Sequence, residues 1–299
     1  MRFVRRLAGS GYRWIMAFAG RRALERMLSR GLPPRLAPAL RFLFTGHATP
    51  EARRAAARVE ELRAKIARQP DTYRFVQHEN PLGAVRWLER VTERADDDVT
   101  SRHLARSVSV DRRWGMFLHL CADGFEARTI LEMGACVGIS GAYLASARSH
   151  PRLVTIDASE ALAAVARETL AAVTDRATMV VEPFATGLPR ALASIAAPID
   201  LAYIDGHHDE QATQHYVRTV VPHLAPGAVV VLDDIHLYAE MWRAWQAVAS
   251  IRGFAAAVNV GRFGLLVWSG GDVTPVQYDL ARFTGWWPVG RSRKRSLER

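Results

Sequence analysis

The sequence has little of what builds secreted or membrane-spanning proteins. Its only cysteines, Cys121 and Cys136, cannot form a disulfide framework, so we expect a reducing, cytoplasmic location. The best apolar run near the N-terminus, residues 14–19, falls far short of the ~20 residues that a membrane-spanning helix needs. Arg13 also interrupts this region, which makes it a poor secretory signal. Internal repeats are absent as well, which argues against a repeat array.

Lysine is scarce, and positive charge is concentrated at the two ends of the chain. Lys65 and Lys294 are the only lysines, and arginine supplies the other basic residues. Residues 1–70 carry 16 basic residues against 4 acids and residues 291–299 carry 5 against 1, whereas residues 71–290 carry 19 against 25. A nucleic-acid-binding core is usually basic, so we do not expect nucleic acid as a partner.

The basic N-terminal segment has several interpretations. Apolar residues stand among its arginines at positions that could form one side of a helix: Phe3, Leu7, Trp14, Phe18, Leu24, Met27 and Leu28. We favour a helical extension that packs on the main domain or on a second copy of the chain in a homo-oligomer. Such a helix could instead lie on an anionic membrane surface as a peripheral contact. An Arg-rich, acid-poor start is also typical of an organelle transit peptide.

From Thr100 onward, short apolar segments alternate with helical patterns. A helix is expected over residues 101–125, followed by strands at 129–133, 153–156, 178–181, 201–204, 228–232, 255–260 and 263–268. This alternation predicts an α/β fold with a doubly wound, Rossmann-like, mostly parallel sheet covered by helices on both faces. The last two strands are joined by a tight turn, so we expect them to be antiparallel. We divide the chain into a basic helical extension (1–100), an α/β domain (101–270) and an irregular basic tail (271–299).

In such a sheet, ligands bind at the carboxyl ends of the strands. In the first turn, Gly134 allows the chain to leave the strand tightly, and Gly138 allows backbone to approach a ligand. Cys136 stands where the dinucleotide fingerprint needs glycine, which disfavours a nicotinamide cofactor. Asp157 follows Gly134 by 23 residues, where a carboxylate can bind both hydroxyls of a ribose. The alternative is a glycine turn that serves only strand–helix packing.

Four segments in this order resemble the class I S-adenosylmethionine-dependent methyltransferases. They are LEMGACVGISGAYLA, LVTIDAS, IDLAYIDGHHDEQAT and LAPGAVVVLDDIH. They are most similar to the small-molecule O-methyltransferases of the catechol and macrocin types, in which Asp-Gly-x-His precedes a strand that ends in paired acids. The resemblance covers about residues 101–270 and implies a seven-stranded sheet with one reversed strand.

The resemblance also implies how S-adenosylmethionine is bound. Glu132, Gly134 and Gly138 would border the methionine part and the sulfonium, and Asp157 would bind the ribose hydroxyls. Ala158 and Phe184 would lie near the adenine. Asp205, at the end of the fourth strand, completes the expected cofactor-binding set.

In metal-dependent relatives, the acids that end the fourth and fifth strands hold a divalent cation, and those positions here are Asp205, Asp233 and Asp234. Neighbouring strands lie roughly 4.8 Å apart, so these carboxylates could converge on one ion. An all-oxygen set suits Mg²⁺. Equally, Asp205 could cap a turn with Gly206, and Asp234 could cap the following helix.

His208 is the candidate catalytic base, because an imidazole can take a proton from a hydroxyl near neutral pH. His207 is its rival, and a solvated loop histidine is the other interpretation. The predicted function is S-adenosylmethionine-dependent methyl transfer to an oxygen of a small-molecule acceptor, with or without Mg²⁺. The alternative is a non-catalytic or differently reacting member of the fold that docks to a membrane or an anionic partner through its basic N-terminus.

Overall fold

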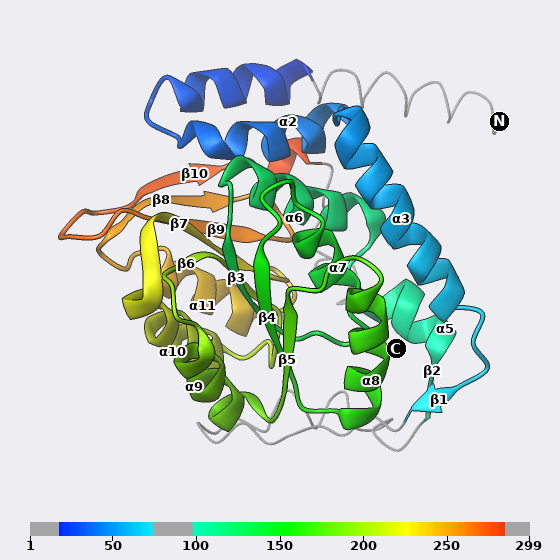
Figure 1. The fold of residues 1–299 in the computed structure, drawn as a ribbon. Coiled ribbons are helices and arrows are strands. Elements are labelled where there is room, and N and C mark those ends of the chain that lie inside the picture. Colours follow the sequence, from blue (N-terminus) through cyan, green and yellow to red (C-terminus); the bar gives the residue numbers. More distant parts are fainter. Residues whose placement is uncertain (1–17, 74–97, 285–299) are drawn as a thin grey trace, which may run out of the picture.

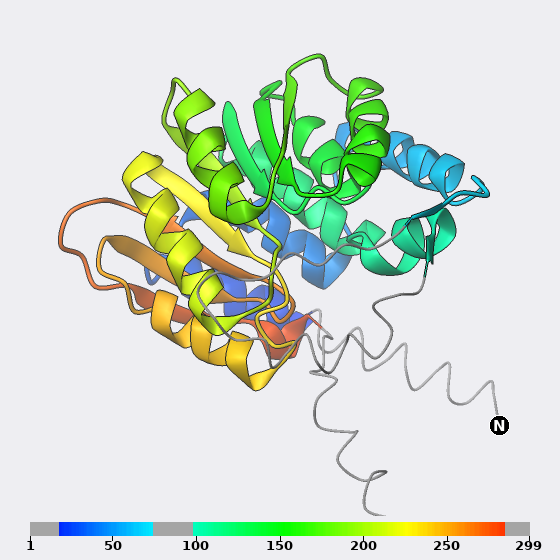
Figure 2. The ribbon, with the colours of Figure 1, turned by 90° about the horizontal axis from the view of Figure 1, so that it is seen from below.

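The computed structural model describes residues 18–73 and 98–284 (Figure 1). The predicted apolar positions Phe3, Leu7 and Trp14 and the end of the basic tail lie outside the described residues. The described part is built around one large sheet with helices on both faces, as the alternating pattern predicts (Figure 2).

The large sheet has eight strands in the order β10-β8-β9-β7-β6-β3-β4-β5. In this sheet only β9 is antiparallel to its neighbours, β7 and β8, so the predicted antiparallel pair is confirmed. The strands are β3 (Thr129–Met133), β4 (Arg152–Asp157), β5 (Ala177–Val181), β6 (Ile199–Ile204), β7 (Leu224–Leu232), β8 (Phe254–Asn259), β9 (Gly264–Trp268) and β10 (Val276–Asp279). A separate two-stranded sheet pairs β1 (Thr72–Tyr73) with β2 (Val99–Thr100).

The C-terminal segment differs from the expected seven strands and irregular tail. β10 is an eighth strand, which pairs parallel with β8 at the sheet edge, and a 3₁₀ turn, η5 (Ala281–Phe283), follows it. The only buried side chain of β10 is Tyr278, whose hydroxyl donates a hydrogen bond to the Arg30 carbonyl at 3.0 Å. An edge strand with one inward residue lacks the apolar run that marks buried strands, so the sequence pattern did not predict it.

Each face of the sheet has its own set of helices, because successive side chains of a strand point to opposite faces. In β3, Ile130 belongs to the hydrophobic cluster of one face and Leu131 to that of the other. The first face is covered by α6 (Arg112–Gly124), α7 (Ile139–Ala145) and α8 (Glu160–Ala171), with α2 (Ala37–Thr45) and α3 (Pro50–Ile66) packed outside α6. The second face is covered by α9 (Phe184–Ser194), α10 (Glu210–Val220) and α11 (Ala239–Val248).

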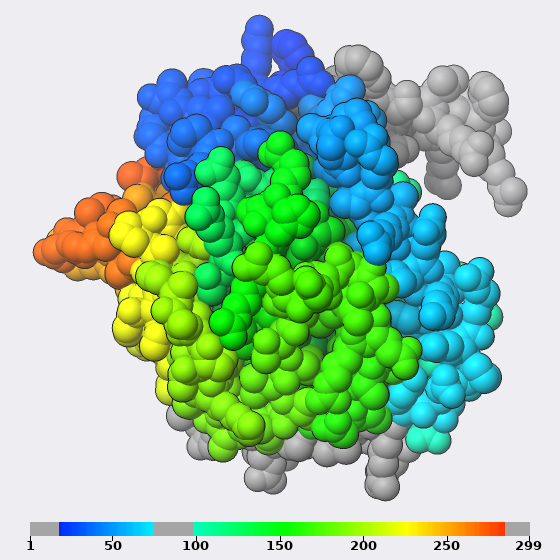
Figure 3. Space-filling model, in the orientation of Figure 1, coloured from blue at the N-terminus to red at the C-terminus, as the bar shows by residue number. Residues whose placement is uncertain are grey.

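The N-terminal helices pack on this domain. A helix over residues 18–28 buries Leu24 completely, and its Gly20 lies against the Phe44 ring and the Cβ of Phe283. Figure 3 shows residues 18–66, in blue, as a continuous layer over one end and one side of the sheet domain. In the ranges that the structure describes, no helix combines the length and the apolar character that crossing a membrane requires.

The helix predicted over residues 101–125 is broken in the structure. α5 (Ser101–His103) continues into a π-helical turn, η3 (Leu104–Val108), and α6 begins only after a gap. Asp111 caps α6, because its Oδ1 accepts hydrogen bonds from two backbone N–H groups of the first turn. Ser109 and Val110 therefore lie between the two helical segments, and they line the cavity described below together with Val108.

Arg63 of α3 holds the broken segment in place. Its Nη1 and Nη2 donate hydrogen bonds to the carbonyls of Ala105 and Val110 at 2.6 and 2.5 Å, and its Nε pairs with Glu60. Replacing Arg63 with methionine leaves these buried acceptors without donors, so we expect the free energy of unfolding to fall by about 3 kcal/mol. Urea unfolding measures this loss. Arg54→Met, on an exposed part of α3, is the control and should change stability by less than about 0.5 kcal/mol. Equal losses for both variants would contradict the role of Arg63.

Candidate active site

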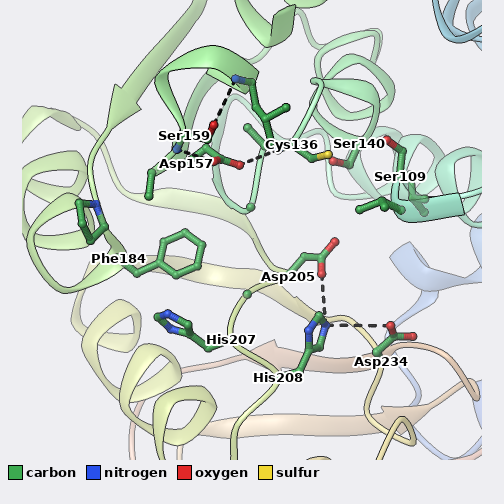
Figure 4. A pocket seen from close by; sticks show the side chains of 18 of the residues that line it. Ser109, Cys136, Ser140, Asp157, Ser159, Phe184, Asp205, His207, His208 and Asp234 are labelled. Carbon is green, nitrogen blue, oxygen red and sulfur yellow. Dashed lines mark hydrogen bonds and ion pairs between the residues drawn. The ribbon is translucent and has the colours of Figure 1, made fainter. Parts of the chain in front are cut away.

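A cavity of about 390 Å³ lies at the carboxyl ends of the strands (Figure 4). It is bounded by the turns that follow β3 to β7, by residues 108–110, and by the turn between β8 and β9. In the sheet, β3 has β4 as its neighbour on one side and β6 on the other. The strand order therefore reverses at β3, and the cavity lies at this switch point.

The cavity brings together most of the residues predicted for the site. Seven of the ten line it: Gly134, Asp157, Ala158, Phe184, Asp205, His208 and Asp234. Glu132 and Asp233 are buried outside its lining. Gly138 is also absent from the lining, because it packs against α8, where an added Cβ would lie 3.0 Å from the Ala166 backbone. Helix packing therefore explains Gly138 without a ligand.

Asp157 is held in a fixed orientation at the end of β4. Its Oδ2 accepts a hydrogen bond from the Cys136 N–H at 2.7 Å, and its Oδ1 accepts one from the Ser159 N–H at 3.0 Å. The Cys136 backbone has a φ of 47°, a left-handed conformation that turns this N–H toward the carboxylate. Burial raises the pKa of the Cys136 thiol to about 12, so it remains a neutral thiol rather than a nucleophile.

Two glycines allow the turns around the cavity to pack closely against one another. Gly134 has a φ of 98°, and an added Cβ would lie 1.9 Å from the carbonyl oxygen of Asp205. At Gly206 an added Cβ would lie 2.3 Å from the Phe184 ring. The turns after β3, β5 and β6 can therefore meet only because both positions lack a side chain.

Glu132 lies in β3 beneath the first turn and is fully buried. Its Oε2 accepts a hydrogen bond from the Thr155 hydroxyl at 2.6 Å, whereas its Oε1 has no hydrogen-bond partner within the described residues. Burial raises the pKa of Glu132 to about 7, against the hydrogen bond from Thr155, which lowers it. A buried acceptor without a donor is costly, and this cost disfavours the charged form of the Glu132 carboxyl.

Asp205, His208 and Asp234 form a cluster on the opposite side of the cavity from Asp157 (Figure 4). His208 Nε2 lies 3.3 Å from Asp205 Oδ1 and 4.0 Å from Asp234 Oδ2. His208 and Asp234 have φ values of 43° and 50°, and such left-handed conformations are uncommon outside glycine. Strained backbone of this kind gathers at functional sites.

The acids around His208 change its proton affinity. Burial alone would lower the pKa of His208, but the hydrogen bond and the charge of Asp205, with the charges of the two acids after β7, raise it to about 9. Burial favours the neutral form of Asp205, yet the pKa of this carboxyl is lowered by His208 and Arg262. The cluster therefore contains a carboxylate beside an imidazole that binds its proton tightly.

His207 occupies a different part of the cavity. Its Nδ1 is hydrogen-bonded to the Tyr216 hydroxyl, and its ring meets the Phe184 ring edge-on with 5.2 Å between centroids. His207 thus extends the aromatic wall, away from the acid cluster, whereas His208 faces the acids (Figure 4).

Comparisons with known proteins agree with this geometry. A family model described as a methyltransferase domain matches residues 131–235. A catechol O-methyltransferase of Mycobacterium tuberculosis is 32% identical over 169 residues, which are 53% of this chain and 74% of that protein. A catechol O-methyltransferase of Niastella koreensis is 30% identical over 136 residues, which are 43% of this chain and 59% of that protein.

A crystal structure of a Bacillus cereus O-methyltransferase in complex with SAH aligns with a TM-score of 0.49 and 22% identity, over 62% of this chain and 90% of that one. The chain belongs to the class I S-adenosylmethionine-dependent O-methyltransferases.

In this O-methyltransferase Asp233, one of the three predicted metal ligands, is bonded to protein groups. Its carboxylate accepts hydrogen bonds from Arg262 Nε and Nη2, both at 2.7 Å, from the Asp234 N–H at 2.7 Å and from the Tyr203 hydroxyl at 2.9 Å. The Asp233 side chain is fully buried. Within residues 18–73 and 98–284, no group of three His, Cys, Asp or Glu side chains is arranged to hold a metal ion. The three acids are therefore close in space but are not a free set of oxygen ligands.

Several residues of the methyltransferase cavity were not predicted from the sequence. Among them are Ser109, Ser140, Ser159 and Arg262. The position of Arg262 could have been predicted from the sequence. β8 runs parallel to the central strands, so the turn between β8 and β9, which holds Arg262, must lie at the carboxyl ends of those strands. Ser109 carries no such signal, since its position depends on the break before α6.

Proposed function

We propose that this O-methyltransferase transfers a methyl group to a hydroxyl oxygen of a small acceptor, with His208 as the base that removes the hydroxyl proton. The supporting observation is that His208 and Asp157 line opposite sides of one cavity (Figure 4). Asp157 is suited to hold the ribose of the cofactor, and His208 is suited to meet the acceptor.

The cofactor would be held by residues from the strand ends. Asp157 would accept hydrogen bonds from both ribose hydroxyls, since two backbone N–H groups already fix its carboxylate. Ala158 and Phe184 would contact the adenine, and Gly134 would let the backbone approach the methionine part. Glu132, buried beneath the turn that holds Gly134, would border the methionine part from below. When bound, S-adenosylmethionine supplies a methyl group on a sulfonium sulfur that keeps the electron pair of the broken C–S bond.

The proton of the acceptor would move to His208 as the new O–C bond forms. Asp205 lies on the Nε2 side of His208, which favours the neutral tautomer with its hydrogen on Nε2. The proton would then be received at Nδ1. A pKa of about 9 makes this imidazole a stronger base than an ordinary histidine, and it approaches the ~10 of a phenolic hydroxyl.

The two catechol O-methyltransferases among the relatives make catechol the first acceptor to test. The purified chain is incubated with methyl-labelled S-adenosylmethionine and catechol, phenol or an aliphatic diol, and products are separated by chromatography. We expect a mono-O-methylated catechol and less product from the aliphatic diol, whose hydroxyls hold their protons more tightly.

The outcome that would contradict this proposal is specific. If calorimetry detects S-adenosylmethionine binding but no hydroxylated acceptor is methylated between pH 7 and about pH 9, His208 is not a base for O-methylation. Methylation of an amine or a thiol in the same assay would assign a different acceptor class to the cavity.

A further inference from the structure

The acidic strand ends are already balanced by side chains of this chain. Asp233 accepts two of its hydrogen bonds from Arg262 and two from other groups, and a carboxylate has about four lone-pair sites. No oxygen of Asp233 is left to bind a metal ion. Asp205 and Asp234 each lie within 4.0 Å of His208 Nε2.

Arg262 also reaches the cavity itself. Its Nε lies 3.5 Å from Asp234 Oδ1, and its side chain, 17% exposed, lines the cavity together with His208. Within the described part of the chain, no protein group accepts a hydrogen bond from its Nη1. A guanidinium is always charged and can bind a carboxylate on one edge while it donates to another oxygen on the other. Arg262 thus has both the charge and a spare donor in the cavity that the candidate base also lines.

We propose that Arg262 takes the place of a divalent cation at this site, so that methyl transfer needs no metal ion. The guanidinium neutralises the acids after β7 and offers Nη1 to the oxygen of the acceptor. This inference deepens the proposed function and rests on it for the contact with the acceptor. The neutralisation of the acids rests only on the contacts of Arg262.

Mn²⁺ is the probe that tests whether Arg262 occupies the place of a divalent cation. Its electron paramagnetic resonance signal reports binding without any turnover. We expect the full chain to show no specific Mn²⁺ binding. Arg262→Gln should bind Mn²⁺ at least about tenfold more tightly, because the two acids after β7 then lack the guanidinium that pairs with them. Adding Asp234→Asn to Arg262→Gln should remove the gained binding. Arg252→Gln, which removes an exposed arginine just before β8, is the matched control and should behave as the wild type.

A chelation experiment gives a second measurement that does not depend on the folding of a variant. Wild-type activity should be unchanged, within about twofold, after dialysis against EDTA and after Mg²⁺ is added back. Specific Mn²⁺ binding by the wild type as tight as that of Arg262→Gln, or activity lost to EDTA and restored by Mg²⁺, would overturn the inference. If no acceptor is methylated, the Mn²⁺ titration still decides whether Arg262 replaces the cation, so the two proposals fail separately.

Discussion

Replacing His208 with glutamine lowers kcat for methyl transfer by about 10²–10⁴-fold, the range that a positioned base contributes. Glutamine can still hydrogen-bond to Asp205, which lies 3.3 Å from the His208 ring, but it cannot take up a proton. The cofactor should bind with unchanged affinity, because Asp157 lies on the other side of the cavity (Figure 4). Steady-state kinetics at saturating S-adenosylmethionine measures the loss, and calorimetry measures the affinity.

The pH profile distinguishes loss of a base from loss of packing. A base must be neutral to accept a proton, and the pKa of His208 is about 9, so about one molecule in a hundred is competent at pH 7. The logarithm of kcat/KM should therefore rise with a slope of about one up to about pH 9 and then level. His208→Gln should lose this rise.

His207→Gln is the matched control for the His208 variant. It changes the adjacent histidine, which bonds to Tyr216 and lies away from the acid cluster, so the rise with pH should persist. If the rise disappears in His207→Gln and persists in His208→Gln, the base is His207.

The sheet could be predicted because its strands are buried on both faces. Runs such as Leu201 to Ile204 and Val229 to Leu232 are apolar at every position, which is typical of central parallel strands. β10 could not be predicted, because Tyr278 is its single inward residue. The break before α6 could not be predicted, because hydrogen bonds from Arg63 to the carbonyls of Ala105 and Val110 stabilise it. These residues lie 42 and 47 positions after Arg63 in the sequence.

The site was predictable where topology alone brings residues together. Asp205 and Asp234 follow the neighbouring strands β6 and β7, and Asp157 ends β4 on the other side of β3, so the sheet places all three around one cavity. The hydrogen-bond partner of each acid could not be predicted from the order of the strands, because these partners lie on other segments of the chain. Asp233 is bound by Arg262, 29 residues later in the chain, so this predicted metal ligand is half of a buried ion pair in the structure.

Replacing Asp157 with alanine should raise the dissociation constant for S-adenosylmethionine by about 10²–10⁴-fold. A hydrogen bond to a charged group contributes about 1.5–3 kcal/mol, and the proposed ribose contact has two of them. Titration calorimetry with the full chain measures the change. S-adenosylhomocysteine should lose affinity by the same factor, since both molecules carry the same ribose.

A folding defect must be separated from a lost contact, because Asp157 also accepts hydrogen bonds from the Cys136 and Ser159 N–H groups. Asp157→Asn keeps the size of the side chain and one acceptor oxygen, so it should retain the fold and lose affinity by an intermediate factor. Asp175→Ala removes an exposed aspartate from the loop after α8 and should leave affinity unchanged. Wild-type affinity in both Asp157 variants would place the ribose elsewhere in the cavity. Equal losses in Asp157→Ala and Asp175→Ala would instead indicate that binding responds to net charge, because only Asp157 lines the cavity.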